Sequence, residues 1–200
     1  MATGRASAPW PAIRELLGAE RTLLNFLTHL SGIATATRAR ADALSGTGCA
    51  VRDTRKTTPG LRQLEKYAVR CGGGLNHRMG LGDAALIKDN HVAAAGGVTA
   101  AIAAVRAAAP SLPLEVECDT LAQVREALDA GAGLILLDNM GLADLRTAAA
   151  LAAGYPAGGQ RGLQLAEARA VAATGVDFVA VGALTHSSPA LDLGLDLLPC

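Results

Sequence analysis

The sequence predicts an α/β fold, a barrel of parallel strands with helices packed around it. Half of the 200 residues are apolar, yet only 2% are aromatic, so the core must consist mainly of small aliphatic side chains. Such cores are typical of helices packed closely on a parallel sheet. Helical and strand patterns alternate along the chain, and the absence of a GxGxxG fingerprint favours the barrel over a doubly wound sheet.

The first elements follow from the composition and the spacing of apolar residues. Residues 1–11 are rich in Gly, Ala, Ser and Pro, and we expect them to be disordered. The barrel domain then occupies residues 12–200. Leucines recur three and four residues apart over residues 13–44, which predicts a helix with a break or bend at Ser31-Gly32. A short strand is expected at residues 49–51.

A second helix is predicted to begin at Thr58 and Pro59. Threonine is favoured at the N-cap of a helix, and proline is favoured at its first position. We expect the inner face of this helix to be Leu61, Leu64, Ala68 and Cys71.

Strands and helices then alternate regularly with short turns between them, which is the pattern of a parallel sheet. The expected strands are residues 84–87, 114–118, 134–138 and 178–182, and the expected helices are residues 98–109, 120–130, 142–153 and 165–174.

Charge and composition exclude several kinds of partner. The net charge is zero, which argues against nucleic acid and against a membrane surface, and no apolar run approaches the roughly 20 residues that cross a bilayer. The N-terminus has no apolar stretch typical of a secretory signal, so a cytoplasmic location is the default expectation. The four cysteines are scattered without a CxxC pair, which indicates neither a zinc site nor a disulfide framework.

A cationic window between residues 52 and 91 is the strongest indication of a site. It holds all three lysines of the chain and eight of its eighteen cationic residues, against four acidic residues. Arg55 and Arg78 can each bind a carboxylate or phosphate through two hydrogen bonds, whereas Lys56 and Lys88 supply compact charges. The window therefore predicts a site for an anionic, phosphorylated ligand.

Polar residues also follow the predicted strands. Lys88, Glu117 and Asp138 each lie at a strand's carboxyl end, and in a barrel these ends face one mouth. Glu117 and Asp138 suit a hydrated Mg²⁺, and the backbone amides of Gly182 and Ala183 could hold a phosphate.

Simpler explanations remain open at this point. Arg52-Asp53 and Glu65-Lys66 could be surface ion pairs, and His77 or His91 could be structural.

Long segments of the sequence resemble one family. They are RDTRKTTPGLRQLEKYAVRCGGGLNHRMGLGDAALIKDNHV, ERTLLNFLTHLSGIAT, EVECD, LILLDN and VGALTHSSPALDLGLD, and the resemblance spans residues 12–153 and 162–197. The family is bacterial quinolinate phosphoribosyltransferase, also called carboxylating nicotinate-nucleotide pyrophosphorylase. Membership implies transfer of phosphoribose from phosphoribosyl pyrophosphate to quinolinate, giving nicotinate mononucleotide, pyrophosphate and CO₂ in NAD synthesis.

The resemblance also implies roles for individual residues. Quinolinate would be bound by Arg55, His77, Arg78 and Lys88. Lys56, between the two substrates, would act in catalysis with Glu117 and Asp138, which would hold Mg²⁺ and the ribose hydroxyls. The ribose 5-phosphate would lie on Val181, Gly182 and Ala183, with Thr54 and Gly162 as further substrate contacts. Arg21 would reach the neighbouring subunit's site, which implies a homodimer or a higher homo-oligomer.

The sequence departs from the family pattern in two places. The family's N-terminal α/β domain is expected to be lacking, and residues 154–162 are expected to lack the strand that precedes a phosphate-binding turn, so that the barrel would be incomplete and partly open. Only Gly162-Leu163 aligns with that turn. Two alternatives follow: an impaired fragment that only pairs with intact subunits, or a related barrel with another phosphorylated substrate.

Overall fold

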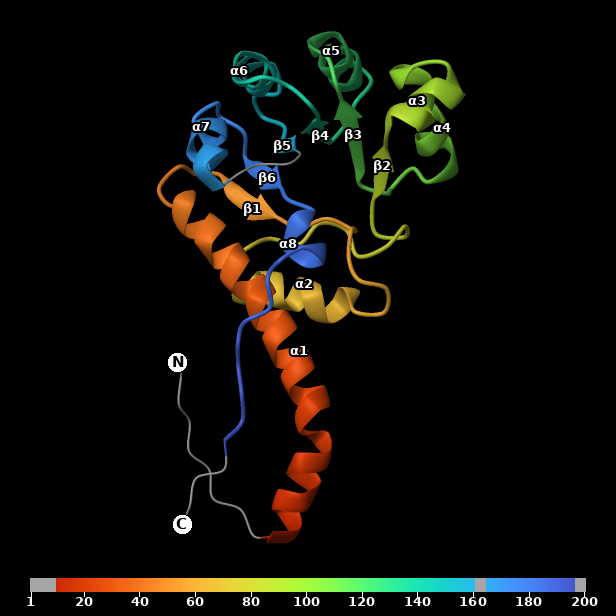
Figure 1. The fold of residues 1–200 in the computed structure, drawn as a ribbon. Coiled ribbons are helices and arrows are strands. Elements are labelled where there is room, and N and C mark those ends of the chain that lie inside the picture. Colours follow the sequence, from red (N-terminus) through yellow and green to blue (C-terminus); the bar gives the residue numbers. More distant parts are fainter. Residues whose placement is uncertain (1–9, 161–164, 197–200) are drawn as a thin grey trace.

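Six parallel strands form one curved sheet in the computed structural model, which describes residues 10–160 and 165–196. The strands lie in the order β1-β6-β5-β4-β3-β2 (Figure 1). Their bounds are Ala50–Arg52 (β1), Ala85–Ile87 (β2), Leu114–Cys118 (β3), Leu134–Leu137 (β4), Ala157–Gln160 (β5) and Phe178–Ala180 (β6). Because β1 and β2 are the two edges of this order, the sheet is a partly open barrel, and the predicted fold class is confirmed.

The two faces of the sheet are covered differently, and the strand register fixes which side chains point inward. Leu136, Phe178 and Ala180 form a small cluster on the inner face, with Leu86 and Leu134 packed against it. Glu115 is paired with Leu86 and Leu134 in register, so Glu115 and Glu117 also face the interior. The alternate residues, among them Val116, Ile135 and Val179, belong to the main core beneath the helices.

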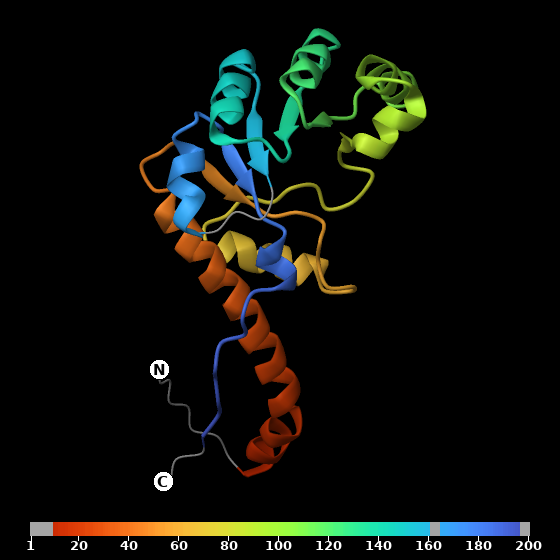
Figure 2. The same ribbon diagram turned by 45° about the horizontal axis from the view of Figure 1, so that its top comes forward.

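Helices line the outer face of the sheet in an arc (Figure 2). Capping is clear at one of them, where the Thr120 hydroxyl accepts a hydrogen bond from the Gln123 amide at the start of its helix. The outer helices are Asp89–Ala95 (α3), Val98–Ala108 (α4), Leu121–Asp129 (α5), Leu142–Leu151 (α6) and Ala168–Ala172 (α7), with a 3-10 turn at Leu165–Glu167. The predicted helix 165–174 is thus shorter and divided, and α3 was not predicted.

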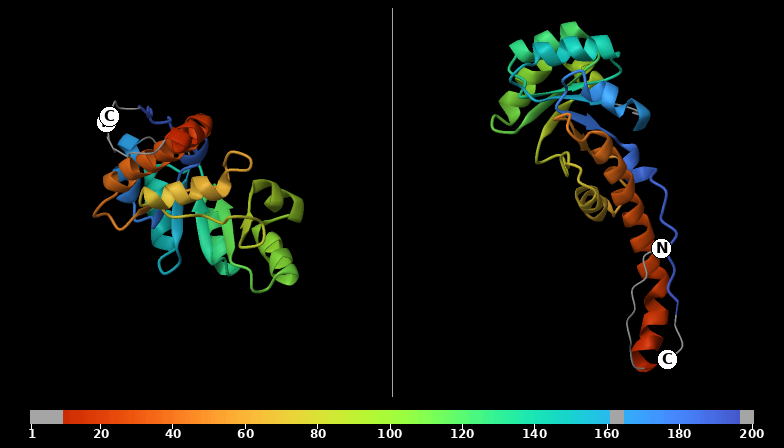
Figure 3. Two further views of the ribbon diagram at one scale, coloured as in Figure 1. Left: turned by 90° about the horizontal axis from the view of Figure 1, so that it is seen from below. Right: turned by 90° about the vertical axis from the view of Figure 1, so that its left-hand side faces the viewer.

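The longest helix is α1, Trp10–Ala43, whose first half projects from the body of the molecule (Figures 1 and 3). The expected break at Ser31-Gly32 is wrong, because the helix is continuous there. Gly32 instead permits close approach of the C-terminal segment: a Cβ at this position would lie 2.1 Å from the Pro189 carbonyl oxygen. Residues 1–9, expected to be disordered, lie outside the described residues, and the helix already includes Trp10.

The strand expected to be lacking is present. Ala157–Gln160 forms β5 and pairs with both β4 and β6. Gly158 takes the place of an apolar residue on the inner face because the interior is filled from the next strand: a Cβ on Gly158 would lie 1.8 Å from Cε2 of Phe178. The prediction of an incomplete barrel was therefore wrong for residues 157–160.

The helix predicted from Thr58 begins later, at Arg62, and ends at Cys71 (α2). Its N-cap is Leu61, and no side chain caps it. The predicted inner face is also wrong in part, because Leu64 and Cys71 are exposed, while the buried residues are Glu65, Lys66, Ala68 and Val69. The charged residues on this face are held by buried partners, described below.

A last short helix, Ala183–His186 (α8), follows β6. Among the described residues, no single helix has the length and apolar character to cross a membrane; only α3 and α4 counted together, across an 89° bend, meet that test.

Candidate functional site

A cavity of about 210 Å³ lies at the carboxyl ends of the strands, and most of the predicted site residues line it. Their gathering follows from the parallel sheet, which brings strand ends that are distant in sequence to one mouth. The predicted residues at the cavity are Thr54, Arg55, Lys56, His77, Arg78, Lys88 and Glu117; Arg52, Leu86, Leu136 and Ala180 complete its lining.

A larger cavity of about 460 Å³ lies toward the amino ends of β3 and β4, where Leu114 and Leu134 line it. It shares Arg52, His77 and Arg78 with the first cavity but is not lined by Lys56 or Lys88. The chemistry predicted from the sequence therefore belongs to the smaller cavity.

The segment that carries His77 and Arg78 is held beside β1. Leu75 forms a parallel bridge with Arg52; its amide donates to the Val51 carbonyl at 2.8 Å, and its carbonyl accepts from the Asp53 amide at 3.0 Å. The segment thus adjoins the exposed edge of the sheet without forming a regular strand. Arg78 also donates from Nη1 to the Ala84 carbonyl at 2.9 Å, so this segment contacts the residue that precedes β2 as well.

A chain of charged side chains runs through the barrel interior. The Arg52 guanidinium donates to Oε1 of Glu115 at 2.5 Å, and Nε2 of His77 lies 2.5 Å from Oε2 of the same carboxylate. The guanidinium also lies over the Phe178 ring, 3.7 Å from its centroid. All of these groups are nearly fully buried.

This chain lowers the pKa of Glu115. Burial alone would raise it, but the hydrogen bond from His77 and the charge of Arg52 together outweigh burial, so the pKa lies below its usual value of 4.5. Sequence reasoning missed Glu115. A signal was available, because both glutamates of Leu-Glu-Val-Glu face the same side of a strand that is buried throughout, and a buried carboxylate requires a partner.

Two carboxylates, Glu117 and Asp138, lie at the carboxyl ends of the neighbouring strands β3 and β4. Glu117 is largely buried on β3 and accepts a hydrogen bond from Nζ of Lys88 at 2.6 Å. Asp138 is buried directly after β4, and its amide donates to the Cys118 carbonyl at 3.0 Å. Among the described residues, no group of three or more His, Cys, Asp or Glu side chains forms a metal cage. Two hard oxygen donors nevertheless suit a Mg²⁺ that keeps waters and substrate oxygens as its other ligands.

The turn after β6 adjoins the same mouth. A Cβ on Gly182 would lie 2.9 Å from Cδ of Lys56 and 3.4 Å from Oγ1 of Thr54, so the glycine permits this close approach. The Val181 amide donates to the Arg52 carbonyl at 2.8 Å, which ties the turn to β1. Ala183 is exposed at the first position of α8.

The predicted residues that follow strands β4 and β6 without lining the cavity are Asp138, Val181, Gly182 and Ala183. The other two predicted residues are Arg21 and Gly162. Arg21 is exposed in the first half of α1 and does not line the cavity. Gly162 lies outside the described residues.

The proposed surface pairs are not surface pairs. Asp53, Lys66 and Glu65 are all at most 1% exposed, and Arg52 is 9% exposed. Lys66 binds Asp53, whereas Oε1 of Glu65 lies 2.8 Å from Nε2 of His29 on α1. His91 has a structural role, one of the two interpretations left open by the sequence, because its Nδ1 accepts a hydrogen bond from the Lys88 amide at 3.0 Å.

Comparison with known proteins supports one family throughout. The family described as quinolinate phosphoribosyl transferase, C-terminal domain, matches residues 33–196. The chain is 56% identical to the carboxylating nicotinate-nucleotide pyrophosphorylase of Mycobacterium leprae over 195 residues, covering 93% of this chain and 67% of that protein. It is 44% identical to the human protein of that name, covering 94% of this chain and 64% of the human one.

Solved structures agree with this result. NadC from Streptococcus pyogenes superimposes with a TM-score of 0.86 at 48% identity, over 90% of this chain and 64% of that one. The protein named nicotinate-nucleotide pyrophosphorylase from Ehrlichia chaffeensis gives a TM-score of 0.87 at 43% identity. The chain thus spans about two thirds of the length of these relatives. It belongs to the quinolinate phosphoribosyl transferase family, and residues 33–196 correspond to that family's C-terminal domain.

Proposed function

We propose that this chain transfers phosphoribose from phosphoribosyl pyrophosphate to quinolinate, with decarboxylation, to give nicotinate mononucleotide in NAD biosynthesis. The observation that carries the proposal is the convergence of Arg55, Lys56, His77, Arg78 and Lys88 on one small cavity. A pyridine dicarboxylate and a phosphorylated sugar are both anions, and a site for the two together needs several cations. Relatives at 44% to 56% identity carry the name of this activity.

The cavity residues would act chiefly by binding and positioning. Arg55 and Arg78 can each bind a quinolinate carboxylate through paired hydrogen bonds, and Lys88 adds a compact charge. Their charge offsets the repulsion between the two anionic substrates, which would otherwise oppose close approach. Holding the ring nitrogen near the ribosyl carbon makes the first step effectively unimolecular.

The reaction then proceeds in two bond changes. The ring nitrogen forms a bond to C1 of ribose while the C1–oxygen bond breaks, and the electron pair leaves on pyrophosphate. Lys56, beside Gly182 and Thr54, is placed to offset negative charge that develops on the leaving group. Afterwards the bond from the ring to the adjacent carboxylate breaks, CO₂ leaves, and the ring carbon takes a proton from solvent.

Glu117 and Asp138 would hold Mg²⁺. The ion would supply positive charge to the diphosphate of the donor substrate, as Mg²⁺ does where one or two carboxylates bind it with phosphate oxygens. Glu117 is already bound to Lys88, so this pair also sets the position of the lysine when no ion is present.

A homodimer and a cytoplasmic location belong to the same proposal. Arg21, exposed in the first half of α1, would reach the site of a second copy. Sedimentation analysis of the purified chain tests the dimer, and cell fractionation tests the location.

The activity itself is tested by incubating the purified 200-residue chain with quinolinate, phosphoribosyl pyrophosphate and MgCl₂. Nicotinate mononucleotide, pyrophosphate and CO₂ should appear in equal amounts. A chain that forms no product alone, yet co-purifies with an intact relative, would instead support the alternative of a fragment that pairs with intact subunits. Turnover of a different phosphorylated substrate, with none on quinolinate, would support the related-barrel alternative.

A further inference from the structure

Helix α2 lies beside the cavity without lining it, and it presents charged side chains to the two loops that carry the cavity's cations. The first loop is residues 53–58, which include Arg55 and Lys56. The second loop is residues 75–79, which include His77 and Arg78. Arg62 and Lys66 are four residues apart on α2, so their side chains leave the same side of the helix. Each of them binds both loops.

Lys66 holds the backbone of His77. Its Nζ donates to the His77 carbonyl at 2.9 Å and also binds Oδ1 of Asp53, which accepts from the His77 amide at 2.7 Å. The backbone amide and carbonyl of His77 therefore both bind the Lys66–Asp53 ion pair, whose side chains are at most 1% exposed. The Asn76 side chain closes the arrangement by donating to Oδ2 of Asp53 at 2.6 Å and to the Lys66 carbonyl at 2.9 Å.

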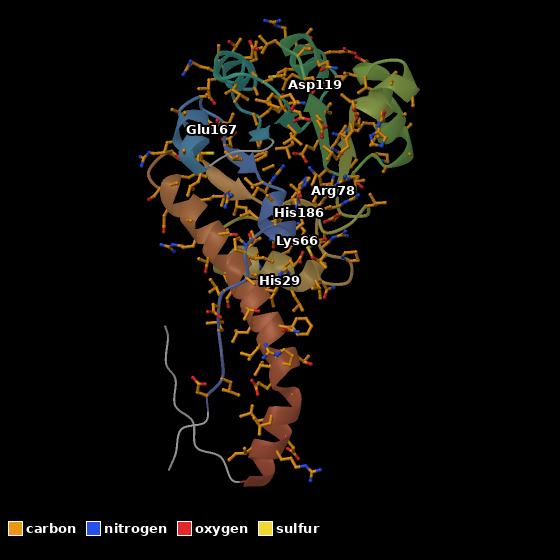
Figure 4. The ribbon with its side chains drawn as sticks, viewed as in Figure 1. His29, Lys66, Arg78, Asp119, Glu167 and His186 are labelled. Atoms are coloured by element: carbon orange, nitrogen blue, oxygen red, sulfur yellow. The ribbon has the colours of Figure 1, made fainter. Side chains whose placement is uncertain are left out.

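Arg62 joins the same loops at their other ends. Its Nε donates to the Thr57 hydroxyl at 3.0 Å, and its two terminal nitrogens donate to the carbonyls of Met79 at 3.0 Å and Arg55 at 3.4 Å. The Arg62 guanidinium thus connects Arg55 in the first loop with Met79, which follows Arg78, in the second loop. Figure 4 labels Lys66, with His29 below it and Arg78 above it in this view.

These contacts oppose a physical difficulty of the site. Like charges gathered in a cavity of about 210 Å³ repel one another when no ligand is bound, and irregular loops are free to move apart. Hydrogen bonds from charged groups are among the stronger ones that a protein makes. We propose that Lys66 and Arg62 are positioning residues, which hold the two loops at the separation that an anionic substrate requires.

The test uses three variants of the full chain. Lys66→Met alone would leave the Asp53 charge buried without its partner, which is strongly destabilising, so it is combined with Asp53→Asn. Arg62→Met is the second variant and affects a more exposed residue. Arg70→Met is the matched control, because it removes the same kind of charge from an exposed position on the same helix.

The first readout needs no substrate. The protection of the amides of residues 75–79 against hydrogen exchange should fall about tenfold in D53N/K66M and in R62M, as expected for loss of charged hydrogen bonds. The protection of residues 114–118 should not change. R70M should match the wild type at both segments. This arm decides the inference even if the wild-type chain shows no turnover.

The second readout rests on the proposed function. The KM for quinolinate should rise about tenfold or more in D53N/K66M and R62M, with a smaller change in kcat, because binding geometry rather than chemistry is disturbed. Protection and KM equal to those of R70M would overturn the proposal. So would a uniform loss of protection over the whole chain with KM unchanged, since that result describes a purely structural role.

Discussion

Replacing Gly158 with alanine tests how the barrel interior is filled. The added Cβ would lie 1.8, 2.3 and 2.5 Å from three ring carbons of Phe178, far inside van der Waals contact. The ring cannot move away freely, because the Arg52 guanidinium lies 3.7 Å from its centroid. The backbone of Gly158 does not occupy the left-handed region, so the cost is steric rather than conformational.

The magnitude follows from overpacking a well-filled core, which costs about 1–3 kcal/mol. In a chain of this length each kcal/mol corresponds to roughly 2–4 °C, so we expect the melting temperature of Gly158→Ala to fall by about 2–12 °C. Differential scanning calorimetry on the purified protein measures this directly.

The neighbouring glycine supplies the control. Gly159 is on the same strand but faces the helices, and a Cβ there would meet Cγ1 of Val171 at 3.3 Å, a contact that small shifts can relieve. Gly159→Ala should therefore melt closer to the wild type than Gly158→Ala. Equal melting temperatures for the two variants, or a Gly158→Ala that melts with the wild type, would refute this account of the interior.

Two further predictions concern charge. Lys88→Ala should raise the KM for quinolinate about tenfold or more, whereas Glu117→Ala should mainly raise the KM for phosphoribosyl pyrophosphate and the MgCl₂ requirement. Steady-state kinetics with each substrate varied in turn measures both effects. Wild-type kinetics in both variants would contradict the assignment. For Glu115, whose pKa is lowered on folding, the stabilisation is present above the usual value of 4.5 and is lost as pH falls through the folded pKa. The melting-temperature difference between wild type and Glu115→Gln should therefore be constant above about pH 4.5 and shrink as the pH falls below it, and a difference that stays constant there would contradict the pairing with His77 and Arg52.

Much of the fold could be predicted because the relevant elements carry strong local patterns. The strand at Leu114–Cys118 was predicted with the observed bounds, since its residues alternate and its ends carry turn residues. For the helices with clear apolar spacing, most of the predicted ends lie within one or two residues of the observed ends. The start of α2 was wrong because Thr58-Pro59-Gly60 resembles a helix start, whereas here the Thr58 amide donates to Oε2 of Glu65 and the helix begins only at Arg62.

Residues at the cavity were predictable because parallel strands place their carboxyl ends together. What sequence reasoning could not supply was the side to which each charged residue turns. Asp53 and Lys66 are 13 positions apart and neither pairs with its sequence neighbour; only the packing of α2 against β1 and the following loop brings them together. A contact between distant residues leaves no local pattern in a single sequence.

The missed strand and the missed carboxylate have one cause. β5, which was expected to be lacking, has a glycine on its inner face at position 158, because Phe178 from β6 fills the space inside the barrel. The same ring supports Arg52, and Arg52 binds Glu115, which in turn holds the ring of His77 at the cavity. Aliphatic layers alone would fill such an interior but could not orient an imidazole. Gly158 of β5 is therefore linked to the site through a single aromatic residue, and loss of quinolinate binding should accompany loss of stability in Gly158→Ala but not in Gly159→Ala.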